Sequence, residues 1–311
     1  MFNVAKFKRV SPSWVLVVAF AVLSVVPAWG GGAGGVASRE VISAPPRPTT
    51  GADYGRYEDF VSRPGGASSL PRSGTAAARS GRAMREYAQK VLGVEHPQLR
   101  LLLSSLYDYS TGNYVRLNAV SRFINKGVLQ ETGGRVVVRD LDSLVEKIID
   151  EGHTWARQFL ALSSARELLM RTWDWNFDWD ELSLERRREL LAGEFEKSPS
   201  ILTYLQSQLR LIDLALRVLP SDKPKPCTGV GPLVFRGVGV STLALYQQGM
   251  RGDTPVVLKD LTSTSTRRVD AIEFDTGIML EIRDVACRGR DISFFSMNSY
   301  EHEYLFPRGT S

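Results

Sequence analysis

Arg236 is the first of several polar residues near the C-terminal end of the sequence whose types suit chemistry. It interrupts an apolar run, Leu233–Val238, and Gly237 follows it directly. A strand arginine commonly extends its head group to solvent. One that faces a cleft instead can bind a diphosphate or a ribose through its planar guanidinium. The glycine would let a ligand approach the backbone closely.

A run of hydroxyl side chains follows further along the chain. Thr262 to Thr266 alternates Thr and Ser without a break, after the apolar residues Val256–Leu258. Runs of Ser and Thr usually form turns, and by itself this one indicates no more than that.

Two carboxylates stand close together in Glu301-His302-Glu303, just before the apolar Tyr304–Phe306. On a strand, residues i and i+2 share a face, so we expect Glu301 and Glu303 to point the same way and His302 to face away from them. Burial of such a pair would raise the pKa of one member. The pair could then bind a polyol and stabilise a cationic centre. On an exposed strand edge it would only be solvated.

The elements that must position these groups differ between the two halves of the chain. From Arg82 to Leu219 the apolar spacing is helical, as in the Leu205, Leu209, Ile212 and Leu216 stripe that we expect in the core. After Pro220, short apolar runs predict strands at 233–238, 256–258, 278–282, 292–296 and 304–306. Helices followed by crowded short strands favour an α+β fold over alternating βαβ units.

The N-terminus has the pattern of a secretory signal. Lys6, Lys8 and Arg9 precede the uncharged apolar run Trp14–Val26. In Ala28-Trp29-Gly30, small residues stand at the two positions that a signal peptidase reads, so we expect cleavage after Gly30. A membrane span needs about 20 apolar residues, so this run is short for an anchor. Residues 31–81 are rich in Gly, Ala, Ser, Pro and Arg, and we expect a disordered linker or pro-segment there.

The amino-acid composition excludes several classes of protein. Hydrophobic residues make up 43% and charged residues 23% of the 311 residues, which is typical of a globular chain. The net charge of +5 falls to +2 without residues 1–30, so we expect no nucleic-acid partner. Two cysteines and three histidines exclude disulfide-dense and zinc-cluster scaffolds.

Taken in order, the polar groups resemble the motifs of the mono-ADP-ribosyltransferase family, in its branch with Arg, Ser-Thr-Ser and Glu-x-Glu motifs. Val234–Gly237 is similar to the first motif, Leu261–Ser265 to the second and Ser299–Thr310 to the third. Leu106–Asn118 resembles the helix–loop–helix that opens the family's catalytic domain. The likeness covers about residues 82–311, although the region 126–200 is longer than in a minimal member.

The resemblance implies a fold and an activity. The fold would be α+β, with a mainly helical lobe over residues 82–226. A core of two packed, mainly antiparallel sheets around an NAD cleft would follow over residues 227–311. The activity would be transfer of ADP-ribose from NAD, the co-substrate, to arginine on a target protein by an exported toxin or effector. No metal and no stable membrane insertion are expected.

The resemblance also implies residue roles. Glu303 would stabilise positive charge on the ribose, with Ser263 holding it, and Glu301 would orient the incoming guanidinium. Arg236 would bind the NAD phosphates or the adjacent ribose, and the backbone of Gly237 the nicotinamide amide. The remaining residues expected at the site are Thr264 and Ser265 for NAD, Tyr300 for the target protein, and Phe274 as a candidate cover for the nicotinamide.

Other interpretations remain open at this stage. The same cleft would serve an NAD glycohydrolase, in which Glu301 would be dispensable, and the scaffold could instead be a non-catalytic binding module. In an exported protein Cys227 and Cys287 could form a disulfide, or they could be two buried thiols. The aromatic and acidic patch Trp173–Trp179 could be a recognition surface or a packed loop.

Overall fold

A computed structural model describes residues 48–63, 68–150, 182–197, 200–220, 232–239, 246–247, 257–272, 277–284 and 287–310. The expected signal at 1–30, the Trp173–Trp179 patch, Phe274 and Cys227 lie outside these residues. Pairing of Cys227 with Cys287 therefore stays a prediction. Within the described part of the chain, no helix is long and apolar enough to cross a membrane.

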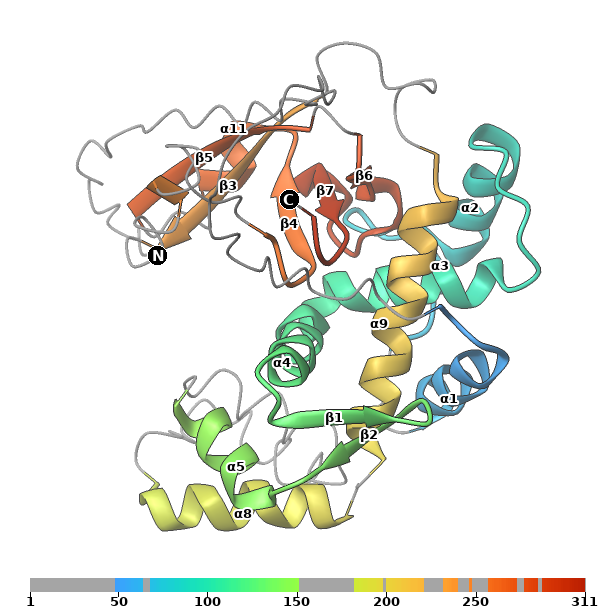
Figure 1. Ribbon diagram of the computed structural model, residues 1–311. Coiled ribbons are helices and arrows are strands. Elements are labelled where there is room, and N and C mark those ends of the chain that lie inside the picture. Colours follow the sequence, from blue (N-terminus) through green and yellow to red (C-terminus); the bar gives the residue numbers. More distant parts are fainter. Residues whose placement is uncertain are drawn as a thin grey trace, which may run out of the picture.

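Helices dominate the N-terminal half, with one short hairpin among them (Figure 1). The helices are α1 (Gly51–Ser62), α2 (Gly81–Glu86), η1 (Tyr87–Val91), α3 (Leu99–Asp108), η2 (Tyr109–Asn113), α4 (Tyr114–Asn125), α5 (Leu141–Asp150), α8 (Leu184–Lys197) and α9 (Ile201–Val218). The antiparallel hairpin joins β1 (Leu129–Thr132) to β2 (Arg135–Val138).

Helix α9 is the central element of this half, and α1, α3 and α4 pack against it. The stripe expected in the core, Leu205, Leu209, Ile212 and Leu216, is buried along its whole length. Helical spacing of these residues keeps one face of α9 continuously apolar, so the prediction is confirmed.

Helix α1 contradicts, for residues 51–62, the expectation of a disordered segment over 31–81. Thr50 and Asp53 form a capping box at its start, in which Asp53 Oδ2 accepts from the Thr50 backbone at 2.9 Å. Tyr57 and Phe60 are buried against the helical core. An amphipathic helix that belongs to the folded unit therefore lies within this Gly- and Pro-rich part of the sequence. The fold begins before residue 82.

The C-terminal strands form a five-stranded antiparallel sheet in the order β5-β3-β4-β7-β6. They are β3 (Leu233–Gly239), β4 (Thr262–Ser265), β5 (Gly277–Arg283), β6 (Arg290–Asp291) and β7 (Glu303–Phe306). Strands β3 and β5 pair along their whole length, whereas β3 meets β4 at the single pair Phe235↔Ser265. The sheet therefore has two parts, β5–β3 and β4–β7–β6, joined at a narrow contact (Figure 1). The α+β class expected from the sequence is confirmed.

Two local expectations were wrong. The Ser and Thr run forms strand β4 because it pairs with β7 on one side and β3 on the other. The strand expected at 292–296 is instead a 3₁₀ turn, Ser293–Phe295. There the Asp291 carboxylate accepts from the backbone N and the hydroxyl of Ser293, which bends the chain.

Candidate active site

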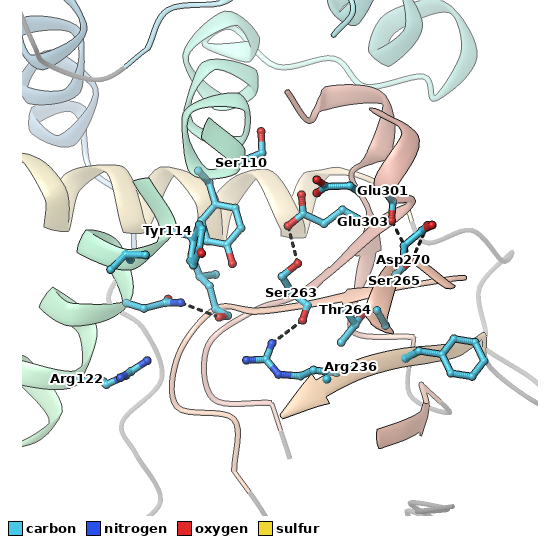
Figure 2. Close-up of a pocket in the computed structure, with 17 residues that line it drawn as sticks. Ser110, Tyr114, Arg122, Arg236, Ser263, Thr264, Ser265, Asp270, Glu301 and Glu303 are labelled. Carbon is cyan, nitrogen blue, oxygen red and sulfur yellow. Dashed lines mark hydrogen bonds between the residues drawn. The ribbon is translucent and has the colours of Figure 1, made fainter. Parts of the chain in front are cut away.

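A cavity of about 420 Å³ opens where the helical half meets β3, β4 and the start of β7 (Figure 2). It is lined by Tyr109, Ser110, Tyr114, Val115, Asn118, Arg122, Phe235, Arg236, Gly237, Leu261, Ser263, Thr264, Ser265, Asp270, Ala271, Glu301 and Glu303. Cavities of this size are typical of small-molecule sites. The expected NAD-binding residues and both expected carboxylates therefore line the same cavity.

Antiparallel pairing brings the three main motif residues together. Strand β4 lies between β3 and β7, so Ser263 stands between Arg236 and Glu303. The Ser263 hydroxyl donates to Glu303 Oε1 at 2.7 Å, and Arg236 Nη1 donates to the Ser263 carbonyl at 2.5 Å. Figure 2 shows this chain of contacts along the cavity wall. Each residue is thus fixed by its neighbour and by its own strand.

The Glu303 carboxyl has an unusual electrostatic environment. Burial raises its pKa from 4.5 to about 7, and the negative charges of Glu301 and Asp291 act in the same direction. Hydrogen bonds from Ser263 and Ser296 oppose the shift because they favour the ionised form. A carboxyl balanced in this way changes charge near neutral pH.

Glu301 reaches the cavity by a route that the sequence did not predict. It ends a 3₁₀ turn, Ser299–Glu301, and the next residue, His302, has left-handed backbone angles. Strand β7 begins only at Glu303. The strand alternation expected for the two glutamates was wrong, yet both line the cavity because the left-handed residue turns the chain between them. The Asn298 side-chain amide donates to Glu301 Oε1 at 2.7 Å.

The other expected site residues differ in their hydrogen bonds and in their exposure. Gly237 and Ser265 line the cavity, and Ser265 Oγ donates to the Glu301 carbonyl at 2.9 Å. Thr264 also lines it, but its hydroxyl donates to the Tyr304 carbonyl, which ties it to β7. Tyr300 is 59% exposed beside the cavity residue Glu301.

Sequence reasoning missed the helical wall. Tyr109, Ser110, Tyr114, Asn118 and Arg122 come from η2 and α4. The segment Leu106–Asn118 was recognised as similar to the family's opening helix–loop–helix, and that signal could have assigned four of the five. It did not show which side chains face the strands, because that depends on the tertiary packing.

The helical wall contacts the strand half directly. Ser110 Oγ accepts from the Met297 backbone N at 2.7 Å, and the Asn118 amide donates to the Leu261 carbonyl at 3.3 Å. Arg122 Nε pairs with Asp260 Oδ2 at 2.6 Å. These contacts fix the width of the cavity.

Residues 205–310 match the family model described as ART: NAD:arginine ADP-ribosyltransferase. This segment contains most of α9 and strands β3 to β7, and so every motif residue described above. The resemblance inferred from the motifs is thus confirmed over this segment. No curated protein matches the sequence.

Among solved structures, the crystal structure of the ADP-ribosyltransferase HopU1 of Pseudomonas syringae pv. tomato is similar to this chain. The two are 16% identical, with a TM-score of 0.41, and the match covers 85% of this chain and 90% of that one.

Proposed function

We propose that this protein is a mono-ADP-ribosyltransferase that moves ADP-ribose from NAD to arginine side chains of a target protein. The observation that carries the proposal is one cavity that unites Arg236, Ser263 and the buried Glu303 with a second carboxylate, Glu301. The family match of residues 205–310 supports the use of NAD.

The cavity offers the groups that NAD needs. Arg236 places a guanidinium on the wall, and such a fork suits a diphosphate or the adjacent ribose. Ser263 and Glu303 supply a hydroxyl and carboxylate oxygens for ribose hydroxyls. Phe235 and Tyr109 add aromatic surface for a planar ring. We assign Gly237, Thr264 and Ser265 to the same binding surface.

The reaction breaks the nicotinamide–ribose bond, and positive charge develops on the ribose ring as in glycoside cleavage. Glu303 in its ionised form stabilises that charge. Ser263 holds the carboxylate in position, and its hydrogen bond favours ionisation. Burial makes the interaction strong because little water screens it.

Glu301 supplies the acceptor side of the mechanism. Its carboxylate would pair with the incoming guanidinium and orient one nitrogen toward the ribose. A free arginine has a pKa above 12, so its proton leaves only as the new C–N bond forms, and Glu301 is placed to accept it. Tyr300, next to it and exposed, would contact the target protein.

We further propose that the protein acts after export, as a toxin or effector. The basic and apolar pattern of residues 1–30 supports this step, with cleavage after Gly30. Expression of the full chain in a secreting bacterial host, followed by N-terminal sequencing of the released protein, tests it. A first residue of Gly31 supports export, and retention of the intact chain in the cells contradicts it.

The activity is tested with residues 48–311, labelled NAD, and agmatine or polyarginine as acceptor. Wild type is compared with Glu301→Gln, Glu303→Gln and the control Glu189→Gln, whose carboxylate lies on the exposed surface of α8. We expect transfer to be lost in both cavity variants, hydrolysis of NAD to survive in Glu301→Gln only, and the control to match wild type. Hydrolysis without transfer to any acceptor in wild type would favour a glycohydrolase. No NAD turnover by folded protein would favour a binding module.

A further inference from the structure

A second cluster of polar side chains lies beside the turn that carries Glu301. Asp270, on the short helix α11 (Arg268–Ile272), places Oδ2 at 3.1 Å from His302 Nδ1. The same oxygen lies 3.2 Å from Ser265 Oγ, which also donates to the Glu301 carbonyl. Figure 2 shows Asp270 and Ser265 next to Glu301. The cluster connects α11 and the end of β4 to the turn.

The turn has a backbone conformation that needs support. His302 has φ 49° and ψ 46°, in the left-handed region that residues other than glycine rarely adopt. This single residue separates Glu301 in the 3₁₀ turn from Glu303 in β7. Relaxation of His302 to an ordinary conformation would rotate Glu301 relative to Glu303.

Contacts from the β4–α11 segment hold that conformation. The Thr266 backbone N donates to the His302 carbonyl at 3.0 Å, and Ser265 Oγ holds the carbonyl of Glu301. In addition to these backbone contacts, the imidazole side chain of His302 contacts Asp270. Asp270 is only 15% exposed and is also approached by Arg267 at 3.9 Å. A largely buried carboxylate favours an N–H donor beside it.

Glu303 is anchored by different contacts. It pairs with Ser265 in the β4–β7 register and accepts from Ser263 at 2.7 Å. The position of the NAD-directed carboxylate therefore does not depend on the imidazole, whereas the position of the acceptor-directed carboxylate does.

We propose that Asp270 and His302 are positioning residues that hold the left-handed turn and thereby aim Glu301 at the acceptor. The inference rests on the proposed function and deepens it, because it assigns the choice between arginine and water to this pair. In transfer, nicotinamide leaves with the electron pair of its bond to ribose. A guanidine nitrogen donates its lone pair to the same carbon, and its proton passes to Glu301. With Glu301 misaligned, water supplies the oxygen that bonds to that carbon, and its proton goes to solvent.

The test is the ratio of transfer to hydrolysis with labelled NAD and agmatine, using the full-length chain. The variants are His302→Ala, Asp270→Ala and their combination, with His302→Asn as a variant that keeps a residue tolerant of left-handed angles. His96→Asn, in the loop before α3, is the matched control. Because Asp270→Ala leaves the residue at position 302 unchanged, an effect shared with His302→Ala identifies the side-chain contact.

We expect His302→Ala and Asp270→Ala each to lower the ratio about tenfold, as for loss of a charge-assisted hydrogen bond, and the double variant to lower it no further. His302→Asn should lose less, because asparagine tolerates left-handed angles. The KM for agmatine should rise, whereas NAD hydrolysis by His302→Ala should stay near the wild-type rate. An unchanged ratio in folded His302→Ala and Asp270→Ala, or additive losses in the double variant, overturns the inference. Absence of transfer in wild type overturns the proposed function itself. The wild-type sample alone therefore separates failure of the proposed function from failure of this inference.

Discussion

The carboxyl of Glu303 is where burial and hydrogen bonding oppose each other most directly. Burial alone would keep it protonated, and a protonated acid cannot stabilise a cation. The hydroxyl of Ser263 counters this by favouring the ionised form, and the balance leaves the pKa at about 7. The residue is therefore half ionised near neutral pH, before any substrate cation adds its own field.

This balance predicts a pH dependence. The rate of NAD hydrolysis should rise with pH through about 7 if, as we propose, the ionised form of Glu303 is the active one. Ser263→Ala should lower the rate about tenfold and move the midpoint to higher pH, since the hydrogen bond that favours ionisation is lost. Rate profiles from pH 5 to 9 measure both effects. A flat wild-type profile across this range contradicts the assignment of Glu303.

The same pKa predicts a stability change of definite sign. Between about pH 4.5 and 7 the folded protein holds a proton on Glu303 that the unfolded chain has lost, so the free energy of unfolding falls as pH rises through that window. The total loss is about 3 kcal/mol. Glu303→Gln removes this dependence, so the variant should gain stability relative to wild type at pH 8 but not at pH 4. Urea unfolding of both proteins at the two pH values measures the difference in their free energies of unfolding. The same difference at pH 4 and pH 8 would contradict the raised pKa of Glu303.

At the scale of elements, the helix–loop–helix α3–η2–α4 positions the wall opposite the strands. Asp108 ends α3 in a buried position, and its carboxylate accepts from the Asn113 and Gln208 amides and from the Ser68 backbone. The chain then turns at Gly112, where φ is 96°. The position of Tyr109 and Ser110 in the cavity depends on this turn.

Gly112→Ala should destabilise the protein by about 1–2 kcal/mol, because a side chain disfavours positive φ. A Cβ there would meet no atom within 4 Å, so the cost is conformational and not steric. The matched control is Gly193→Ala in α8, which also has open space but an ordinary helical backbone. It should be neutral or stabilising by up to about 1 kcal/mol. Thermal unfolding of both variants measures the contrast, and equal effects would refute the role of Gly112.

The sequence predicted the strand-borne part of the site better than the rest. Arg236, Ser263 and Glu303 lie on neighbouring strands, and their motifs have fixed local spacing. The turn that carries Glu301 could not be predicted, because a left-handed histidine has no sequence signal. Whether Tyr109, Asn118 and Arg122 face the cavity depends on how η2 and α4 pack against the strands. Helix α1 was missed because its flanks are rich in Gly and Pro.

For the whole molecule, α9 connects helix α1, the β1–β2 hairpin and the C-terminal segment. Its Arg210 pairs with Asp53 of α1 at 2.9 Å and with Glu131 of β1, and both partners of the first pair are almost completely buried. Its Asp213 pairs with Arg308, near the C-terminal end of the described chain. The helix that begins the family match therefore also anchors the segment before residue 82.

Removal of residues 48–81 should destabilise the fold strongly. The deletion takes away the buried Asp53, Tyr57 and Phe60 and leaves Arg210 without one of its carboxylate partners. Loss of one partner of a buried ion pair alone costs about 3–5 kcal/mol. Residues 82–311 should unfold at lower denaturant than residues 48–311, or fail to fold cooperatively. Equal midpoints for the two proteins would show that α1 contributes nothing.

The most direct test of the central claim is the product that wild-type residues 48–311 make from NAD. Agmatine, which carries a guanidinium, and cadaverine, a diamine of similar length, are offered separately, and products are identified by mass spectrometry. We predict nicotinamide release together with agmatine bearing an ADP-ribosyl group, and no modified cadaverine. Free ADP-ribose formed at the same rate with or without agmatine, and no modified acceptor, would contradict an arginine transferase.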